Sequence, residues 1–583
     1  MLWLERERSY SEEELKIIKL VEKEYLTDGF VASLIAERNN FDLEEIKYFL
    51  SDSFKPISPF GMKDMKKAVD IIYSHMGAGN KILGVVDFDY DGCNAGFCMT
   101  TLFKAFNYNN FECYMPHRQK ESYGLSVKIV EMAYEKGVKL IITADNGIAA
   151  FDAINRANEL GIDVVVTDHH EVQTIVNEAG EIEYNLPSAK AIVNPHQHDC
   201  EYKYKMLSGG AVVYKLSQAM IMCAPNDVKE RFLKQGYKEK IISSAALSAI
   251  GDVMKILGEN RSLVKQAMIY LQEGAIPAVS AIMEKPSVTG VSFNLAPHLS
   301  SVGRLSDMNK SLNFMLEEDA DRIQEMLVEI KEFNELRKKE QEEGLQKALE
   351  LIEEYDTIPD IIIDILPGVA STVLGLVAGK VKEKYNRPVI LFSKTHDGTY
   401  KGSGRSTDFY NLFGEIEPLL GEIEGLSGGG HPAACGLSCK DSTVIFTLRD
   451  ALIKKCKLSD YDKIPKLYID KYLSIRDDFK KLYKDLSLLE PYGVGNPSPT
   501  FAIKSVWLDF EYKKKKNGEF AVVSITDNLE DDFYVDGVCW DENEYLKDGK
   551  KVFDVALADI VVGIDINPYN NEAKLNVKSI KYK

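Results

Sequence analysis

Val164-Val165-Val166-Thr167-Asp168-His169-His170-Glu171 is the stretch of sequence from which the fold can be inferred most directly. Its β-branched run predicts a short buried strand, which ends in an acid and two adjacent histidines. Ligands of open α/β sheets gather beyond the carboxyl ends of the strands. Asp168, His169 and His170 are therefore a candidate site, and their partners have to come from elsewhere in the chain.

Further apolar runs of the same kind flank this strand. They lie at residues 82–87, 139–145 and 191–194, and helical stretches such as 126–136 and 149–161 separate them. Apolar strands that alternate with helices predict an α/β fold with a mostly parallel sheet covered on both faces. Three of the predicted strands end in aspartate and should bring their acids to one edge of the sheet, namely Asp87, Asp145 and Asp168.

At 583 residues the whole chain is long enough for about three or four domains, at roughly 150 residues per domain. A charged segment with an apolar stripe at helical spacing predicts a long connecting helix, and glycine-rich loops are expected at 401–405 and 428–431 in a second α/β region. Alternating strands and the hairpin signal Asn517-Gly518 favour a final barrel of the OB type. We expect a helical cap packed on the next domain (1–78), a parallel-sheet domain (79–308), a connecting helix (309–355), a second α/β domain (356–456), and a linker with an OB-like barrel (457–583).

Composition limits the classes of function. The formal net charge is −19, so general attraction to phosphate cannot be a property of the whole surface, and any nucleic-acid contact must be local or carried by metal. Nine scattered cysteines without paired zinc spacing indicate reduced thiols. The N-terminus lacks a signal-peptide core and no run reaches the roughly 18 apolar residues of a membrane span, so we expect a cytoplasmic protein without membrane contact.

Clustered acids indicate a metal site. Asp87, Asp89 and Asp91 alternate after the first predicted strand, which would place them on one side of an extended backbone, where carboxylates repel unless cations lie between them. Asp145 and Asp252 add further acids, and His169 and His170 add imidazoles. Carboxylates with a few imidazoles suit Mn²⁺ or Mg²⁺ better than thiolate-rich zinc sites do.

In this order the motifs resemble the DHH phosphoesterase superfamily and, within it, the RecJ family of single-strand-specific exonucleases. The four acid motifs are Asp87–Gly92, Asp145–Gly147, Asp168–His170 and Asp252. Lys401–Ser406 and Gly429–Ala434 are similar to the DHH-associated domain with its Gly-Gly-His motif, and Pro491–Pro497 resembles the segment that leads into the OB domain.

The resemblance implies a fold, an activity and a set of site residues. It implies a two-metal exonuclease that releases 5′-mononucleotides from the 5′ end of single-stranded DNA in repair and recombination. The expected catalytic residues are Asp87, Asp89, Asp91, Asp145, Asp168, His169, His170 and Asp252; all of these except Asp168 are expected to bind metal, and Asp168 is expected to orient an imidazole. The expected substrate-binding residues are Arg118, Tyr123, Arg304, Ser403, Gly404, Arg405, Ser406, Gly429, Gly430 and His431.

Some positions depart from the family pattern. Ser300 and His298 stand where the family usually carries Asn and a basic residue, and Val369–Thr372 replaces a Trp-His-x-Gly segment. These departures keep open a phosphodiesterase for short oligonucleotides or cyclic dinucleotides. The resemblance leaves a further alternative, a catalytically silent replication scaffold of the kind found among some relatives of the family. The expected partners are single-stranded DNA, a single-strand binding protein and a helicase, with the chain itself a monomer.

The lysine run Lys513–Lys516 has two readings. Lysines commonly protect an exposed strand edge, which would make the run a solvated hairpin. Alternatively, the run is a local phosphate-tracking patch on the OB surface, with Tyr512 or Phe520 stacking on bases.

Overall fold

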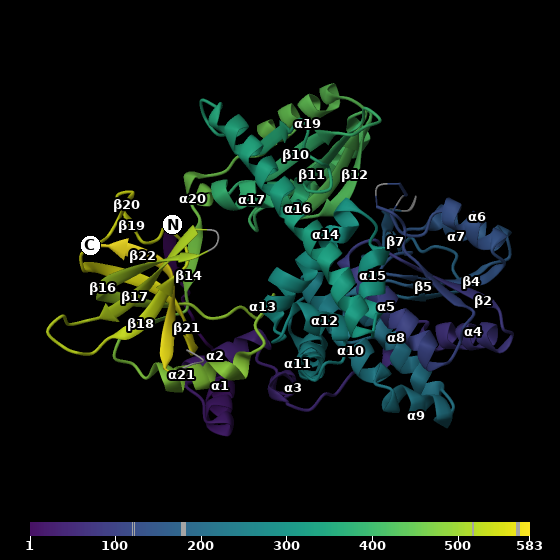
Figure 1. The fold of residues 1–583 in the computed structure, drawn as a ribbon, viewed down its shortest axis with the longest axis horizontal. Coiled ribbons are helices and arrows are strands. Elements are labelled where there is room, and N and C mark those ends of the chain that lie inside the picture. The colour runs from purple at the N-terminus through teal and green to yellow at the C-terminus, as the bar shows by residue number, and fades with distance from the viewer. Residues whose placement is uncertain (119, 122, 177–181, 516–517, 567–571) are drawn as a thin grey trace. The chain divides into compact units, whose positions relative to one another are not determined.

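The computed structural model describes residues 1–583 except 119, 122, 177–181, 516–517 and 567–571 (Figure 1). The chain forms two compact units, each assembled from separate stretches. Unit 1 comprises Met1–Ile57, Val253–Lys265 and Lys466–Lys583, and unit 2 comprises Ser58–Asp252 and Gln266–Pro465. These units do not follow the five predicted segments, whose boundaries remain a prediction.

Unit 2 contains the parallel sheet predicted from the apolar runs. Its strand order is β3-β2-β4-β5-β8 and all of its neighbouring strands are parallel, which confirms the α/β fold class. The strands are β2 (Lys81–Val86), β3 (Phe111–Tyr114), β4 (Val138–Ala144), β5 (Asp163–Thr167) and β8 (Ala191–Val193).

Helices cover both faces of this sheet. On one face, Leu83, Val85 and Val164 pack in one core with side chains of α6 (Val127–Glu135) and α7 (Phe151–Glu159). On the other face lies α5 (Tyr90–Ala105), and a Cβ on Gly84 would come within 2.6 Å of the sulfur of Met99 in that helix. Helices α8 (Gly209–Cys223) and α10 (Tyr237–Gly251) pack against α5. Asp87, Asp145 and Asp168 therefore follow β2, β4 and β5 at one edge of a buried sheet.

The remaining elements of this part of unit 2 are mostly helical. They include a π-helical turn at Val291–Leu295 and the predicted long helix, which is α16. The elements are η1 (Pro59–Gly61), α4 (Met65–Gly77), β6 (Thr174–Val176), β7 (Ile182–Tyr184), α9 (Asn226–Lys234), α12 (Pro277–Ile282), α13 (Val288–Gly290), η2 (Val291–Leu295), α14 (Ala296–Leu305), α15 (Asn309–Leu316) and α16 (Ala320–Glu353), while α11 (Gly258–Gln272) begins in unit 1 and ends in unit 2.

A second sheet completes unit 2, with the order β12-β13-β11-β10-β9. The expectation of glycine-rich loops is wrong here, because both segments are strands. Gly402 and Gly404 allow neighbouring side chains to lie across the sheet: an added Cβ would come within 2.4 Å of Phe392 and 2.5 Å of Cys435. The elements are β9 (Ile362–Ile365), α17 (Leu374–Tyr385), β10 (Val389–Lys394), β11 (Tyr400–Arg405), α18 (Leu412–Glu422), β12 (Leu426–His431), β13 (Ala434–Cys439), α19 (Ser442–Lys455) and α20 (Asp460–Lys463).

Unit 1 contains the predicted barrel. The strands β16, β17, β18, β22 and β21 pair in that order, and β21 pairs back to β16, which closes a five-stranded barrel. The two residues between β16 and β17, Lys516 and Asn517, lie outside the described residues, so the predicted Asn-Gly turn is not described. The elements of unit 1 are β1 (Leu2–Glu5), α1 (Glu12–Tyr25), α2 (Gly29–Arg38), α3 (Leu43–Leu50), β14 (Lys466–Ile469), β15 (Lys471–Leu473), α21 (Phe479–Leu486), η3 (Ser487–Leu489), β16 (Phe501–Lys515), β17 (Gly518–Thr526), β18 (Val535–Cys539), β19 (Leu546–Lys547), β20 (Lys550–Lys551), β21 (Ala556–Ile566) and β22 (Ala573–Tyr582).

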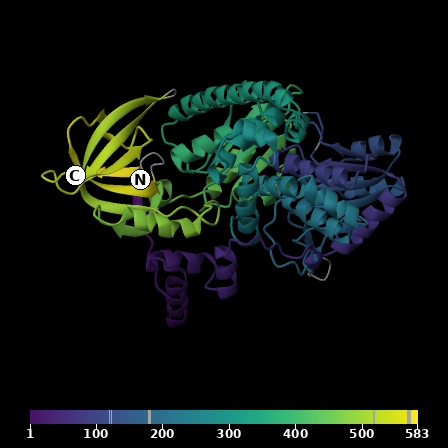
Figure 2. The same cartoon turned by 60° about the horizontal axis from the view of Figure 1, so that its bottom comes forward.

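The first three helices belong to the barrel's unit, so the expected packing of a cap on the parallel-sheet domain is wrong for residues 1–57, whereas α4, in the same predicted segment, packs in unit 2 against β8 and α8. Ile35 and Phe49 share one buried core with Phe501 and Ile503 of β16. Figure 2 shows this purple helical segment below the yellow-green part of the same unit. The helical spacing of apolar residues predicted these helices, but it did not indicate which part of the chain their apolar faces pack against. Within the described parts of the chain, none of the helices is long and apolar enough to cross a membrane.

Candidate metal centre

The first acid motif turns directly from a strand into a helix. Asp87 follows β2, whereas Asp89 is the N-cap of α5 and accepts a hydrogen bond from the backbone of Gly92 at 2.9 Å. Asp91 lies in the first turn of α5, so the expected extended backbone with alternating acids is wrong. A Cβ on Gly92 would come within 2.2 Å of the Asp87 carbonyl oxygen, so only glycine permits this tight turn.

Asp91 is fixed by the start of α8. Its carboxylate accepts hydrogen bonds from the backbone N–H groups of Gly209 and Gly210 at 2.8 and 2.9 Å. The hydroxyl of Ser248, on α10, donates to the same carboxylate and also contacts the hydroxyl of Ser208. Unpaired N–H groups at a helix N-terminus stabilise a negative charge, so this carboxylate is held in place without a cationic side chain.

Asp145 occupies a strained backbone position at the end of β4. Its φ is +62°, which is uncommon for a residue other than glycine and is often found at functional sites. Its carbonyl oxygen accepts a hydrogen bond from the hydroxyl of Tyr123 at 3.0 Å. Gly209 packs directly on it, because an added Cβ would come within 2.4 Å of the Cβ of Asp145.

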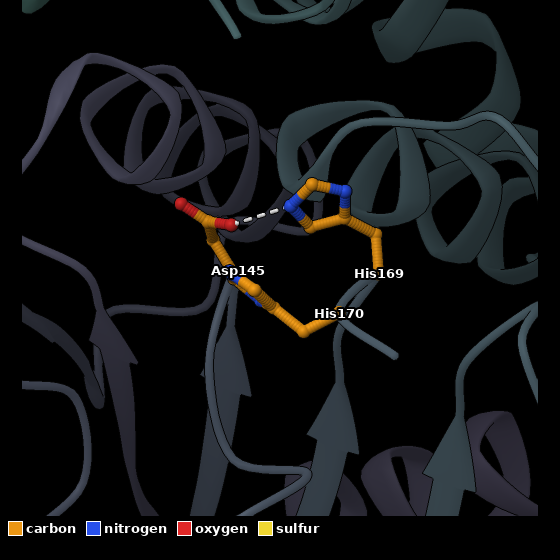
Figure 3. A group of neighbouring side chains, drawn as sticks. All are labelled: Asp145, His169 and His170. Carbon is orange, nitrogen blue, oxygen red and sulfur yellow. Dashed lines mark ion pairs between the residues drawn. The ribbon is translucent and has the colours of Figure 1, made fainter. Parts of the chain in front are cut away.

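His169 is the point at which three acid motifs meet. Its Nε2 lies 3.1 Å from Asp145 Oδ1, 3.7 Å from Asp91 Oδ2 and 3.8 Å from Asp252 Oδ2. Figure 3 shows the ring of His169 turned toward the Asp145 carboxylate, with His170 next to it at the end of the neighbouring strand. Asp252 reaches this point as the C-cap residue of α10.

Asp168 supports the two histidines from behind. Its carboxylate lies 2.7 Å from Nδ1 of His170 and accepts a hydrogen bond from the backbone N–H of His169 at 2.8 Å. The backbone N–H of Ile148 also donates to it at 2.9 Å. With its oxygens engaged in this way, Asp168 orients the imidazole of His170, whose Nε2 remains directed toward the hydroxyl of Tyr123 at 3.4 Å.

Crowded carboxylates dominate the electrostatics of this centre. Burial and the charge of Asp89 raise the pKa of Asp87 well above its ordinary value, and burial with the charge of Asp91 does the same to the pKa of Asp145. Burial together with Asp91 and Asp89 raises the pKa of Asp252 to about 8. For Asp168, burial opposes ionisation, but the hydrogen bond with His170 and its charge hold the pKa of Asp168 below its ordinary value.

These donors fit divalent cations. Three overlapping groups offer ligand atoms within 4.8 Å of one another: Asp145 with His169 and His170, Asp91 with His169 and Asp252, and Asp87 with Asp89 and Asp145. The buried Oδ1 of Asp87 has no hydrogen-bond partner in the described chain. A buried carboxylate oxygen without a donor is costly, and a bound cation would satisfy it. Carboxylates with imidazoles, and no thiolate, match Mn²⁺ or Mg²⁺.

A group of arginines lies beside the acids in unit 2. Burial and the nearby charges of Arg118, Arg405 and Arg337 lower the pKa of Arg304 to about 10, and Asp89 is close enough to oppose this shift. Arg304 donates to the carbonyl oxygen of Thr372 at 2.8 Å, and the guanidinium of Arg118 lies 5.0 Å from the ring centre of Phe88. The charges of these arginines act on one another, and guanidinium groups are suited to bind phosphate.

The second sheet holds the other expected substrate residues. Strand β13 pairs with β11 on one side and with β12 on the other, so Ser403–Arg405 and Gly429–His431 flank the same strand. Arg405 donates to Gly404 O at 2.7 Å and to Ser403 Oγ at 3.2 Å. Ser406 is buried and donates to the carbonyl of Tyr410, whereas His431 is exposed. Arg405 belongs to the arginine group because its charge acts on Arg304. The contacts of the described residues do not connect His431 to this group.

Three features of the centre are not apparent from the acid motifs. Asn146 donates to the carbonyl oxygens of Val85 and Ala144, and so joins the ends of β2 and β4. Ser248 lies four residues before Asp252 on α10, and this helical spacing beside an acid is the signal that could have identified it. Arg337 of α16 joins the arginine group from a helix that reads in sequence only as a charged connector.

Family models place the centre in a known class. The model of the DHH family, N-terminal domain, matches residues 81–250, and the DHHA1 domain model matches residues 359–458. The parallel sheet, the Asp-His-His motif and the second α/β domain thus define a DHH-type phosphoesterase. The RecJ OB domain model matches residues 469–580 in unit 1.

Relatives that match two thirds of the chain or more identify the family within this class. The chain is 32% identical over 410 residues to the single-stranded-DNA-specific exonuclease RecJ of Escherichia coli, covering 67% of this chain and 69% of that protein. It is 29% identical over 571 residues to RecJ of Bacillus subtilis, covering 96% of this chain and 68% of that protein. A crystal structure of Thermus thermophilus RecJ in complex with Mn²⁺ shares the fold, with a TM-score of 0.78 at 20% identity over 100% of this chain and 79% of that chain. The chain belongs to the RecJ family.

Proposed function

We propose that this protein is a divalent-metal-dependent exonuclease that degrades single-stranded DNA and releases 5′-mononucleotides from its 5′ end. The observation that carries this proposal is the meeting of three acid motifs at Nε2 of His169, within unit 2 and beside a group of arginines. The RecJ relatives, which are named for single-stranded-DNA-specific exonuclease activity, support the substrate class.

The chain's own residues divide the work of phosphodiester hydrolysis. Asp87, Asp89, Asp91, Asp145, His169, His170 and Asp252 would hold Mn²⁺ or Mg²⁺, and Asp168 would orient His170. Divalent ions bound there would activate water and neutralise charge on the scissile phosphate and the leaving oxygen.

Substrate positioning falls to the residues beside the acids. Arg118, Arg304 and Arg405 would bind the phosphates of the strand, with Tyr123 close to the reacting end. Ser403, Gly404, Gly429, Gly430 and His431 would contact the strand from the second sheet, whereas Ser406 is committed to its hydrogen bond with Tyr410 and would act through the backbone. We further propose that the protein acts as a monomer and that a single-strand binding protein and a helicase supply its single strands. The five segments predicted from the sequence would be its functional domains.

Loss of the metal site tests the proposal. Asp145→Asn and His169→Gln should each lower Mn²⁺-dependent degradation of a single-stranded 20-mer by at least about 100-fold, and calorimetry should show weaker Mn²⁺ binding. Asp163→Asn is the matched control, because Asp163 begins the strand β5 whose other end leads to Asp168. Full activity in Asp145→Asn and His169→Gln would refute the metal centre.

Labelled strands test the polarity. Degradation of a 20-mer that carries the label at its 5′ or its 3′ end, beside a dinucleotide, should release a labelled mononucleotide first from the 5′-labelled strand. Early release from the 3′ label would contradict the proposed direction. Exclusive cleavage of the dinucleotide would favour a phosphodiesterase for short substrates instead.

A further inference from the structure

The chain leaves unit 2 directly after a candidate metal ligand, through a residue in an unusual backbone conformation. Asp252 ends a stretch of unit 2, and Val253 begins the stretch Val253–Lys265 of unit 1. Val253 has a φ of +59°, in the left-handed region. A β-branched residue is a genuine outlier there, because its Cβ lies too close to the following carbonyl oxygen, and glycine is the usual residue one position beyond a helix C-cap.

The side chain of Val253 does little to offset this strain. It is 64% exposed, so the burial of its methyl groups contributes little to stability. A strained residue persists only where the surrounding structure determines its conformation. The contacts that hold Val253 in place therefore have to come from the chain before and after it.

On the unit 2 side, the end of α10 is fixed against the first acid motif. A Cβ on Gly251 would come within 2.1 Å of the ring of Tyr90, so this glycine lies directly on the ring. The hydroxyl of Ser248 donates to Asp91, and the carbonyl oxygen of Ser248 accepts a hydrogen bond from the backbone N–H of Asp252 at 2.9 Å. The last turn of the helix is thus held beside the residues that form the metal centre.

On the unit 1 side, the chain is held again three residues after Val253. The backbone N–H of Ile256 donates to the carbonyl oxygen of Val494 at 2.8 Å. Arg261 donates to the carbonyl oxygens of residues 488–491 in the same loop. Residues 253–255 therefore connect two fixed points, and a connection of three residues leaves little slack.

We propose that Val253 is a positioning residue through which the fold of unit 1 sets the metal affinity of the ligand group Asp91, His169 and Asp252. These three residues offer ligand atoms within 4.8 Å of one another, and all three belong to unit 2. The left-handed conformation of Val253 fixes the direction in which the chain leaves α10, and with it the place of the Asp252 carboxylate. This inference rests on the proposed function, since it takes the centre to bind a divalent metal.

The other two ligand groups provide an internal comparison. Both contain Asp145, and neither includes a residue next to a passage between the units. Their affinity for metal should therefore not depend on residues 253–261. A change in the loop at 488–497 should lower the metal affinity of one ligand group without altering any ligand.

A longer connection tests the proposal. Insertion of Gly-Ser-Gly after Met254 keeps every contact described within each unit, but it lets Asp252 move independently of residues 256–261. Calorimetric titration of the full chain with Mn²⁺, without substrate, should show that the binding lost in Asp252→Asn is weakened about 10- to 100-fold, as is typical when the support of a metal ligand is lost.

The matched control is the same insertion after Pro465. It lengthens another passage between the same two units, at a place that adjoins no candidate ligand. Mn²⁺ affinity should be unchanged in this control. Unchanged Mn²⁺ affinity in the insertion after Met254, or an equal loss in both insertions, would overturn the proposal.

Substitution of Val253 tests the backbone conformation itself. Asparagine tolerates the left-handed region, whereas proline fixes φ near −65°. Val253→Asn should keep the Mn²⁺ affinity of the unaltered chain, and Val253→Pro should lower it at least about tenfold. Thermal denaturation shows whether Val253→Pro is folded; full affinity in the folded variant would contradict the proposal, and if it does not fold, the two insertions decide.

Separate measurements of Mn²⁺ binding and nuclease activity distinguish this inference from the proposed function. Loss of Mn²⁺ affinity in the insertion after Met254, with no nuclease activity in the unaltered chain, would support the positioning role and contradict the proposed function. Full Mn²⁺ affinity in that insertion, with an active unaltered chain, would refute the positioning role alone.

Discussion

Ser248 offers a test of how Asp91 is held. Its hydroxyl donates to the Asp91 carboxylate, and hydrogen bonds to charged groups contribute about 1.5–3 kcal/mol. We expect Ser248→Ala to weaken Mn²⁺ binding by about 10- to 100-fold, as is typical when a residue that supports a metal ligand is lost. Calorimetric titration with Mn²⁺ measures this change.

The control for Ser248 lies on the same helix. Ser243 is fully buried on α10, and its hydroxyl has no hydrogen-bond partner among the described residues. Ser243→Ala should therefore leave Mn²⁺ affinity unchanged. Equal affinities in both variants would show that the hydroxyl of Ser248 does not support Asp91.

Gly209 tests the close approach of α8 to the metal centre. A Cβ at this position would lie 2.4 Å from the Cβ of Asp145, so either the helix or the strained turn at Asp145 would have to move. We expect Gly209→Ala to lower the free energy of unfolding by about 1–3 kcal/mol and to abolish most of the activity. Chemical denaturation and initial rates on a 20-mer are the measurements.

A second glycine provides the contrast. Gly379 lies inside α17, and a Cβ there would meet nothing within 4 Å. Gly379→Ala should raise the free energy of unfolding by about 0.4–1 kcal/mol, because alanine has fewer conformations in the unfolded chain. Normal activity in Gly209→Ala would show that the turn at Asp145 tolerates displacement.

At the scale of elements, the apolar runs predicted the parallel sheet because a buried strand leaves a local signature. The runs placed Asp87, Asp145 and Asp168 after their strands, and the structure places them after β2, β4 and β5. Local patterns did not predict the glycine-rich strands β11 and β12. A strand rich in glycine is stabilised by its neighbours' hydrogen bonds and side chains, and neither is visible in the segment itself.

The backbone conformation around Asp89 and Asp91 could not be predicted from the sequence either, for a physical reason. Alternating acids suggest an extended backbone, but Asp89 caps α5 and the helix begins at the next residue. A short acidic segment is compatible with both an extended strand and a helix N-terminus. The N-terminus of α8, whose backbone binds Asp91, lies more than 100 residues later in the sequence. Such long-range partners are absent from any local reading.

Substitution of Arg261 tests how much its hydrogen bonds to loop carbonyls stabilise unit 1. Its guanidinium donates to the carbonyl oxygens of Phe49, Leu488, Leu489, Glu490 and Pro491, and it lies 3.7 Å from the ring centre of Phe49. Lysine cannot reproduce this planar set of donors, so several buried carbonyls would lose their partners. We expect Arg261→Lys to destabilise unit 1 by roughly 3 kcal/mol.

Thermal denaturation with limited proteolysis measures this effect, since cleavage within residues 466–583 reports on unit 1. Arg322→Lys on α16 is the control, because the Arg322 side chain is 71% exposed and its ion pair, with Glu317, lies at the surface. A thermal midpoint in Arg261→Lys equal to that of the unaltered chain would mean that the loop at 488–491 is held by its other contacts.

At the scale of the whole molecule, the division of the chain predicts the result of truncation. Removing Lys466–Lys583 would leave α1, α2 and α3 without the barrel core into which Ile18, Val31 and Phe49 pack. We expect a chain of residues 1–465 to aggregate and to be cut rapidly within residues 1–57. A chain of residues 58–465 lacks these helices and their exposed apolar faces. It should therefore aggregate less than the chain of residues 1–465.

Size-exclusion chromatography and mass spectrometry of tryptic fragments distinguish the two chains. Protection of residues 1–57 in the chain that lacks the barrel would show that the N-terminal helices fold without it. The sequence alone could not predict this dependence, because α1, α2 and α3 read as ordinary amphipathic helices whatever partner covers them.

The three separate stretches of unit 1 also limit how this chain can exchange parts with its relatives. The polypeptide passes between the units at residues 57, 252, 265 and 465, and Asp252, a candidate ligand, is the last residue before one of these passages. A chimaera could receive only the C-terminal barrel of a relative. Its N-terminal helices and its segment around Arg261 would then still carry the side chains that pack against the original barrel. Productive recombination within the family therefore requires all three stretches to be inherited together.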